Sequence, residues 1–298
     1  MEHESPRGFE VLLAKNVPHI LEKIFFSLDY ESFKNCFEVS KGWKTILTFE
    51  QYLRMAKSVF PENIHDDERK LVCAAERGDA KEVRRLILTP LVDVNHLLIS
   101  HNRGHFTPLI IAACNGNNEV VKLLLDAGAE PQTENETGTS PLQMAARHGH
   151  TDVVVELLER GAEINQCRAL HSAAMYGHKD VVKYLLDKGA QTEMVDKYGR
   201  SPLHVAAILG YVEVVKVLLN KGADPNKVCN IGYTPLHEAV RNGHKEVVTE
   251  LLIGGADPDI KTKRGETLQQ IAKIGDQKDV AKLLSDMKLK FWMTRHTF

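Results

Sequence analysis

The chain has 298 residues, of which 43% are hydrophobic and 26% are charged, an ordinary balance for a folded protein. Its 38 Lys and Arg residues nearly offset its 40 Asp and Glu residues, and the two signs are interspersed, so we expect no nucleic-acid partner. No apolar run is long enough to span a membrane, and the first ten residues, MEHESPRGFE, lack the apolar stretch of a secretory signal.

The first sixty residues carry two apolar helical patterns that have no copy later in the chain. One begins at Pro18 and ends near Leu28. The other begins with Ser32 as a cap, runs to Val39 and is followed by Trp43. Such a short segment cannot bury a good core alone, so we expect its apolar face to pack against a partner or a neighbouring domain.

This segment resembles an F-box, a docking motif of ubiquitin-ligase subunits. The agreeing positions are Val17-Pro18, Leu21, Ile24-Phe25, Leu28-Asp29, Phe33, Cys36, Val39-Ser40-Lys41 and Trp43, with Val17 in place of the usual leucine. The resemblance implies binding to the Skp-type adaptor of a cullin ubiquitin ligase. The implied adaptor-binding residues are Pro18, Leu21, Ile24, Phe25, Leu28, Val39 and Trp43. The alternative is that these helices cap the repeats that follow, with the same residues packed inward.

Residues 44–65 are expected to continue as helix until Pro61 breaks the pattern, after which residues 66–68 lead into a new region. No flexible Gly/Ser stretch separates the two parts. We therefore expect a first module at residues 1–60 and a second at 66–286, held in a fairly fixed relation.

A helical hairpin recurs through the second module. In four copies a proline can open the first helix. A glycine ends that helix, and valine and leucine pairs form the apolar stripe of a second helix. From Val120 to Val280 the equivalent valines are 33, 28, 33, 33 and 33 residues apart. The recurring prolines are Pro108, Pro141, Pro202 and Pro235, and the recurring glycines are Gly116, Gly149, Gly177, Gly210 and Gly243. One hairpin cannot bury its stripe alone, so the copies are expected to stack.

The pattern resembles the ankyrin repeat, whose T-P-L-H-x-A signature appears as residues 234–239, TPLHEA. The resemblance covers residues 66–286. It implies an all-α fold, an ankyrin-repeat solenoid of about seven helix-turn-helix repeats preceded by the small F-box-like segment.

Two departures from the period predict irregular connections. Extra residues between His96 and Phe106 enlarge the first connection, and the 28-residue step removes the projecting hairpin around residues 166–168. The final segment, residues 287–298, is a basic and aromatic tail. We expect its Phe291 and Trp292 to cover the end of the stack, with a short linear motif or disorder as alternatives.

The residues that carry chemistry form no catalytic or metal-binding pattern. The five cysteines, at positions 36, 73, 114, 167 and 229, show no C-x-x-C spacing, which is typical of reduced thiols in the cytosol or nucleus. Six of the fourteen histidines fall in slots that the repeat explains: His150, His171, His178, His204, His237 and His244. No H-E-x-x-H, phosphate-binding loop or nucleophile elbow is present. We therefore expect no enzyme activity, cofactor or metal.

Three asparagines, Asn95, Asn165 and Asn226, each follow an acidic residue at a spacing similar to that of hydroxylated ankyrin repeats. Their ordinary role is to form turns through local side-chain hydrogen bonds, and this is the role we expect.

Ankyrin proteins usually bind through hairpin tips and the exposed side of the first helices. By position, the implied target-binding residues are Arg147, Tyr176, Tyr198, Arg200, Ile208, Leu209, Tyr233 and Arg241. Tyr and Arg are enriched at interface hot spots, although single exposed apolar residues can also be without function. We predict a substrate-recognition subunit of a Skp–cullin–F-box type ubiquitin ligase. The alternative is an ankyrin scaffold or inhibitor with no role in ubiquitination.

Overall fold

The structure, a computed structural model, describes residues 61–89, 92–100, 104–165 and 168–295, together with Asp29 and Ser32. The seven predicted adaptor-binding residues lie outside these described residues. Ser32 is helical, and its backbone N–H donates to Oδ1 of Asp29 at 2.8 Å. Asp29 therefore supplies the capping oxygen, and the prediction of Ser32 as the cap was wrong.

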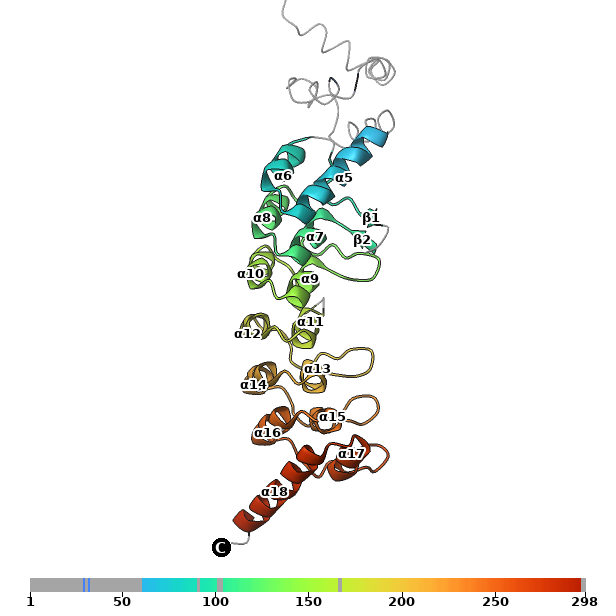
Figure 1. The fold of residues 1–298 in the computed structure, drawn as a ribbon. Helices are drawn as coiled ribbons and strands as arrows, with labels where there is room; N and C mark the ends of the chain where they lie inside the picture. Colours follow the sequence, from blue (N-terminus) through green and yellow to red (C-terminus); the bar gives the residue numbers. More distant parts are fainter. Residues whose placement is uncertain are drawn as a thin grey trace, which may run out of the picture. The chain divides into compact units, whose positions relative to one another are not determined.

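The described helices form seven consecutive pairs, as the repeat predicts (Figure 1). Their bounds are α5 Pro61–Arg77, α6 Ala80–Ile87, α7 Pro108–Asn115, α8 Asn118–Asp126, α9 Pro141–His148, α10 Thr151–Glu159, α11 Ala169–Met175, α12 Lys179–Asp187, α13 Pro202–Leu209, α14 Val212–Asn220, α15 Pro235–Asn242, α16 Lys245–Ile253, α17 Leu268–Ile274 and α18 Lys278–Arg295. The four recurring prolines each occupy the first position of a helix, and the five recurring glycines all have positive φ. These predictions are confirmed.

The chain divides into two compact units, one with residues up to 112 and 119–130, and one with residues 113–118 and those from 131 onward. In the first unit, α5 packs on α6. Arg84 of α6 pairs with Glu119 of α8 at 3.1 Å. Leu86 of α6 and Leu124 of α8 are fully buried. This unit therefore has its own core.

In the second unit each helix contacts the equivalent helices of the neighbouring pairs. The first helices, α9, α11, α13, α15 and α17, form one row, and α10, α12, α14, α16 and α18 form a second (Figure 1). Ala145, Ala173 and Ala206 are fully buried, and their small side chains allow the first helices to approach closely. Each buried leucine, such as Leu185 or Leu218, contributes about 1.5–3 kcal/mol before entropy is counted. Stability therefore accumulates from pair to pair.

The enlarged first connection contains two short strands, β1 Leu98–Ser100 and β2 Gly104–Phe106, paired antiparallel with Leu98 opposite Phe106. The extra residues thus form a β-hairpin, a small addition to the helical fold. Pro61 begins the first of the described helix pairs. Residues 66–68 lie inside α5, which starts at Pro61, because proline suits the first position of a helix.

Histidines at the repeat positions join neighbouring pairs. Nδ1 of His204 accepts from the backbone N–H of Ser201 at 3.2 Å, and its Nε2 donates to the Tyr233 carbonyl oxygen at 3.0 Å. His237 takes the same position beside Thr234, with its Nδ1 3.1 Å from the backbone nitrogen. Four other histidines donate from Nε2 to a backbone carbonyl oxygen at 2.9–3.0 Å: His171 to Arg200, His150 to Cys114, His178 to Arg147 and His244 to Ile208. The predicted structural role of these histidines is confirmed.

The side chains of the three asparagines bond across repeats, while the backbone N–H groups of Asn95 and Asn226 donate locally to Asp93 and Asp224. Asn226 donates to the carbonyl oxygen of Gly255 at 3.2 Å and accepts from the N–H of Asp257 at 2.7 Å. Asn95 makes the same type of contacts with residues 128 and 130, and Asn165 accepts from the N–H of Gln191 at 3.0 Å. Their side chains join successive turns, so the expectation that these side chains bond locally was wrong.

At the end of the chain, residues 287–295 continue α18 as helix. Their side chains lie outside the described part of the structure, so the covering role of Phe291 and Trp292 stays a prediction.

Candidate protein-binding surface

The eight predicted target-binding residues all lie in the second unit. Four of them stand at the ends of first helices: Arg147 on α9, Ile208 and Leu209 on α13, and Arg241 on α15. Tyr176 directly follows α11, and the other three, Tyr198, Arg200 and Tyr233, belong to the connections before α13 and α15. The predicted adaptor-binding residues are not among the described residues.

Asp196 orders the tip of the connection before α13, the tip that carries Tyr198. Its Oδ1 accepts from the backbone N–H groups of Tyr198 at 2.8 Å and of Arg200 at 2.9 Å, and its Oδ2 lies 2.7 Å from the Arg200 guanidinium. Partial burial opposes ionisation, but these hydrogen bonds outweigh it and hold the pKa of the Asp196 carboxyl below its ordinary value. The tip is thus ordered before any partner binds, which lowers the entropy cost of binding.

Arginines also lie over three of the tyrosine rings. Arg200 is 4.7 Å from the Tyr198 ring centroid, and Arg241 is 5.9 Å from that of Tyr233. Tyr198 nevertheless remains 52% exposed. Lys197 Nζ also lies 5.0 Å from the Tyr198 ring centroid, and cation–π contacts of this kind help to hold an aromatic ring in place.

A cavity of about 470 Å³ brings together Tyr198, Arg200, Ile208 and Arg241. Ile231, which is exposed, also lines it. The cavity thus combines an aromatic ring, apolar side chains and two guanidinium groups, the composition typical of interface hot spots.

Glu238 of α15 lines the same cavity and is only 6% exposed. Burial raises the pKa of its carboxyl, and the positive charges of Arg241 and Arg200 offset this only in part. The cavity therefore holds a buried acid close to two cations, an arrangement suited to recognising polar groups of a partner by hydrogen bonds.

A second cavity, of about 840 Å³, lies beside α15 and α17. Arg241 lines this cavity too, together with Lys263, Arg264 and Glu266, and Ile274 adds apolar surface. Three cations thus face one carboxylate, and that carboxylate accepts a hydrogen bond from Thr262 at 3.0 Å. The lining therefore favours an acidic partner.

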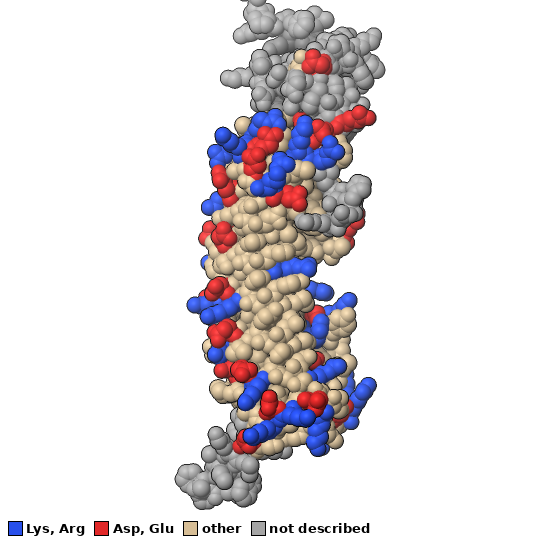
Figure 2. All heavy atoms as spheres, in the orientation of Figure 1, with Lys and Arg blue, Asp and Glu red and all other residues tan. Residues whose placement is uncertain are grey.

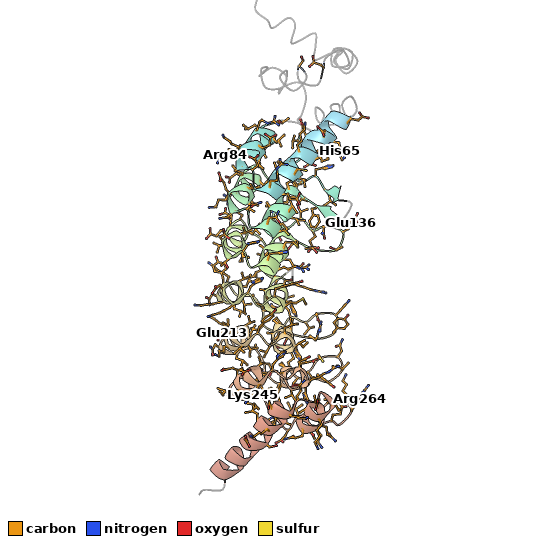
Figure 3. All side chains as sticks on the ribbon, viewed as in Figure 1. His65, Arg84, Glu136, Glu213, Lys245 and Arg264 are labelled. Carbon is orange, nitrogen blue, oxygen red and sulfur yellow. The ribbon has the colours of Figure 1, made fainter. Side chains whose placement is uncertain are left out.

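The basic side chains follow the edge from which the connections project. In Figure 2, Lys and Arg spheres recur along this edge of the lower repeats, with fewer Asp and Glu spheres between them. Arg264 lies on this side in Figure 3, opposite Glu213 and Lys245, which lie in the first turns of second helices.

The eight predicted target-binding residues do not all line one cavity. Arg147 and Tyr176 contact each other, with the guanidinium 5.0 Å from the ring centroid, but they line neither of the two cavities. Leu209 is exposed and also lies outside them. Tyr233 lines only the larger cavity. The two cavities therefore form two separate subsites along the row of first helices.

Ile274 and Glu238 are two of the lining residues that are not among the eight predicted ones, although the repeat contains their signal. Ile274 stands 33 residues after Arg241, which itself stands 33 residues after Ile208. Glu238 occupies the variable position of the TPLHEA signature. Extending the same arithmetic by one repeat would have identified Ile274.

Two protein-family models match the repeats of this chain. A model of three consecutive ankyrin repeats matches residues 71–168 and 165–229, and a model of a single ankyrin repeat matches residues 231–263. The chain belongs to the ankyrin-repeat family. The all-α repeat fold expected from the sequence is confirmed, with the β1–β2 hairpin as an addition. No F-box motif is detected.

Two solved structures resemble the ankyrin repeats of this chain. The human ASB11 ankyrin repeat domain is 30% identical, with a TM-score of 0.62, and the match covers 68% of this chain and 90% of that one. The ankyrin repeat domain of Bcl-3, described as a unique member of the IkappaB protein family, is 28% identical with a TM-score of 0.62. That match covers 72% of this chain and 97% of the other. None of the curated proteins matches the sequence.

Ankyrin repeats are protein-interaction modules, so this chain is a protein-binding scaffold, and no catalytic family matches it. Within the part of the chain that the structure describes, no helix is both long and apolar enough to cross a membrane.

Proposed function

We propose that this ankyrin protein is the substrate-recognition subunit of a Skp–cullin–F-box type ubiquitin ligase. The ankyrin repeats bind the target protein, and the first sixty residues bind the adaptor. The adaptor half of the proposal depends on the resemblance of residues 17–43 to an F-box. The target half is supported by the cavity in which Tyr198, Arg200, Ile208 and Arg241 meet.

The charge around the cavities supports a target segment of a particular chemistry. Arg241 lines both cavities and stands near Lys263 and Arg264 in the larger one. A segment with one or more carboxylates would form charge-assisted hydrogen bonds with these groups. An apolar side chain beside the carboxylates would pack on Ile208 and Ile231. We therefore propose an acidic segment with an apolar anchor as the part of the target that binds here.

The adaptor half is tested by a double substitution. Leu21→Asp with Ile24→Asp is expected to abolish binding to a purified Skp-type adaptor, because two carboxylates would have to be buried without partners. The far-UV circular dichroism and the thermal midpoint of the repeats should not change. If the unmodified chain does not bind the adaptor, this half of the proposal is wrong.

The target half is tested by reversing one charge. Arg241→Glu is expected to weaken target binding by about 2 kcal/mol or more, roughly 30-fold, because Arg241 faces both cavities. The target is first isolated with a chain that lacks residues 1–45, and its affinity is then measured by calorimetry.

Lys245→Glu is the matched control for this test. It makes the same charge reversal in the same repeat at an exposed position of α16, away from the cavities. Equal losses for Arg241→Glu and Lys245→Glu would contradict the proposed surface, because only the net charge would then matter.

The alternative function is an ankyrin scaffold or inhibitor without a ubiquitin role, which the absence of a detected F-box favours. In that case the first sixty residues would cap the repeats. Hydrogen exchange separates the two functions: slower exchange in α5 and α6 of the full chain than in a chain of residues 61–298 would favour the cap.

A further inference from the structure

Two additions to the repeat plan occur close together in the first unit. α5 has 17 residues, whereas the other first helices have seven or eight, so its first two turns have no counterpart in the other pairs. The enlarged connection after α6 contains the β1–β2 hairpin. His65 and Glu68 belong to the additional turns of α5, and His96 stands two residues before β1. The other first helices have no turns that correspond to those that carry His65 and Glu68.

The three side chains converge. Nδ1 of His96 lies 3.1 Å from Oε2 of Glu68. The rings of His65 and His96 are edge to face, with centroids 5.6 Å apart. One ligand atom of each residue lies within 4.8 Å of the others. Residues three apart share one face of a helix, so α5 presents His65 and Glu68 to the same point (His65 is labelled in Figure 3).

We propose that His65, Glu68 and His96 bind a zinc ion. Two imidazole nitrogens and one carboxylate oxygen are a donor set that suits zinc, whereas magnesium and calcium prefer oxygen ligands alone. Tetrahedral ligands about 2.0–2.1 Å from zinc stand about 3.4 Å from one another. The distance between His96 and Glu68 already agrees with this spacing. His65 is exposed and can close the remaining separation by turning its side chain.

The neighbouring acids have basic partners, and Oδ1 of Asp67 lies 3.4 Å from Nζ of Lys70. Asp66 is the acid next to His65 in the sequence, but it pairs with Arg69 and Lys70, each at 2.7 Å. Glu68 is only 3% exposed. A metal ion would place a positive charge beside this buried carboxylate, and water would complete the coordination. The ion would fasten the connection before the hairpin to α5, a bond between elements far apart in the sequence.

The proposal is tested by titrating zinc into the full chain after chelator treatment and dialysis. Calorimetry is expected to show one saturable zinc ion per chain, and magnesium should give no saturable binding. His96→Ala and Glu68→Gln should each weaken zinc binding by roughly tenfold or more. Glu68→Gln is informative because glutamine keeps the size of the side chain and can still accept a hydrogen bond from His96, yet it loses the charge.

His148→Gln is the matched control, since His148 is an exposed histidine on α9, outside the cluster, and it should leave zinc affinity unchanged. Far-UV circular dichroism establishes that each variant is folded. The proposal is overturned if the unmodified chain shows no saturable zinc binding, which would mean that His96 and Glu68 form only a hydrogen bond. It is equally overturned if Glu68→Gln and His96→Ala bind zinc as the unmodified chain does.

Discussion

Lowering the pH from 6.5 to 4 is expected to reduce the free energy of unfolding by about 3 kcal/mol through His204 alone. His204 is fully buried between two repeats. Burial lowers the pKa of its imidazole from 6.5 to about 4, and the hydrogen bond to the Tyr233 carbonyl offsets the effect only in part. Lys227 also lowers this pKa, whereas Glu193 and Asp196 raise it.

The direction follows from proton binding. Between pH 6.5 and 4 the imidazole of His204 is protonated in the unfolded chain and neutral in the folded chain. The unfolded state therefore binds more protons, and acid favours unfolding. Above pH 6.5 both states are neutral and the full stability is present. Burial lowers the pKa of His171 and His237 as well, so these residues add to the effect in the same direction.

Urea unfolding at several pH values measures the effect, and His204→Gln is the matched variant. The chain already has glutamine at the equivalent position of α9, Gln143, whose backbone N–H bonds to the cap Ser140 at 3.2 Å, so the substitution fits the repeat. Below pH 6.5, the slope of the unfolding free energy against pH should be smaller in the variant by about 1.4 kcal/mol per pH unit. An unchanged slope would show that His204 does not carry this pH dependence.

Gly210→Ala is expected to destabilise the chain by about 2–4 kcal/mol, because it adds two costs. Gly210 has a φ of 77°, a left-handed conformation that is unfavourable for alanine. The added methyl carbon would also stand 2.6 Å from Nδ1 of His244. The ring of His244 would have to move, and its 2.9 Å bond to the Ile208 carbonyl would break.

Gly222→Ala separates the two costs. Gly222 has a φ of 83°, but an added methyl group would meet nothing within 4 Å, so only the backbone cost of about 1–2 kcal/mol remains. Chemical denaturation of both variants, and of Gly210→Ala combined with His244→Ala, forms the comparison. In the His244→Ala background the cost of Gly210→Ala should fall toward that of Gly222→Ala. Equal costs in the two backgrounds would rule out the steric contact.

The sequence was sufficient to predict the features that recur from repeat to repeat. The spacing of Pro202, Gly210 and Val214 predicted the helix pairs, and the same arithmetic placed Ile208 and Arg241 on one surface. It also contained the signal for Ile274. What it lacked was the bonding partner of each polar side chain, because Asn226 bonds to a turn about thirty residues away and nothing local in the sequence specifies that contact.

The features outside the period were the least predictable. The number of residues between His96 and Phe106 showed that the connection is enlarged, but length alone does not distinguish a loop from a β-hairpin. The cluster of His65, Glu68 and His96 arises only when that connection packs beside α5. Its members are spread over about thirty residues without the short spacing of known metal motifs, and the sequence therefore indicated no metal site.

The row arrangement of the second unit has a consequence for the history of the gene. Because α13 and α14 each pack against the equivalent helices of the adjacent pairs, an in-frame duplication of residues 202–234 would insert a further pair whose main contacts follow the existing pattern. Recombination could thus lengthen or shorten the recognition face without inventing a new core, and new specificity would then require changes only at positions such as 208 and 241.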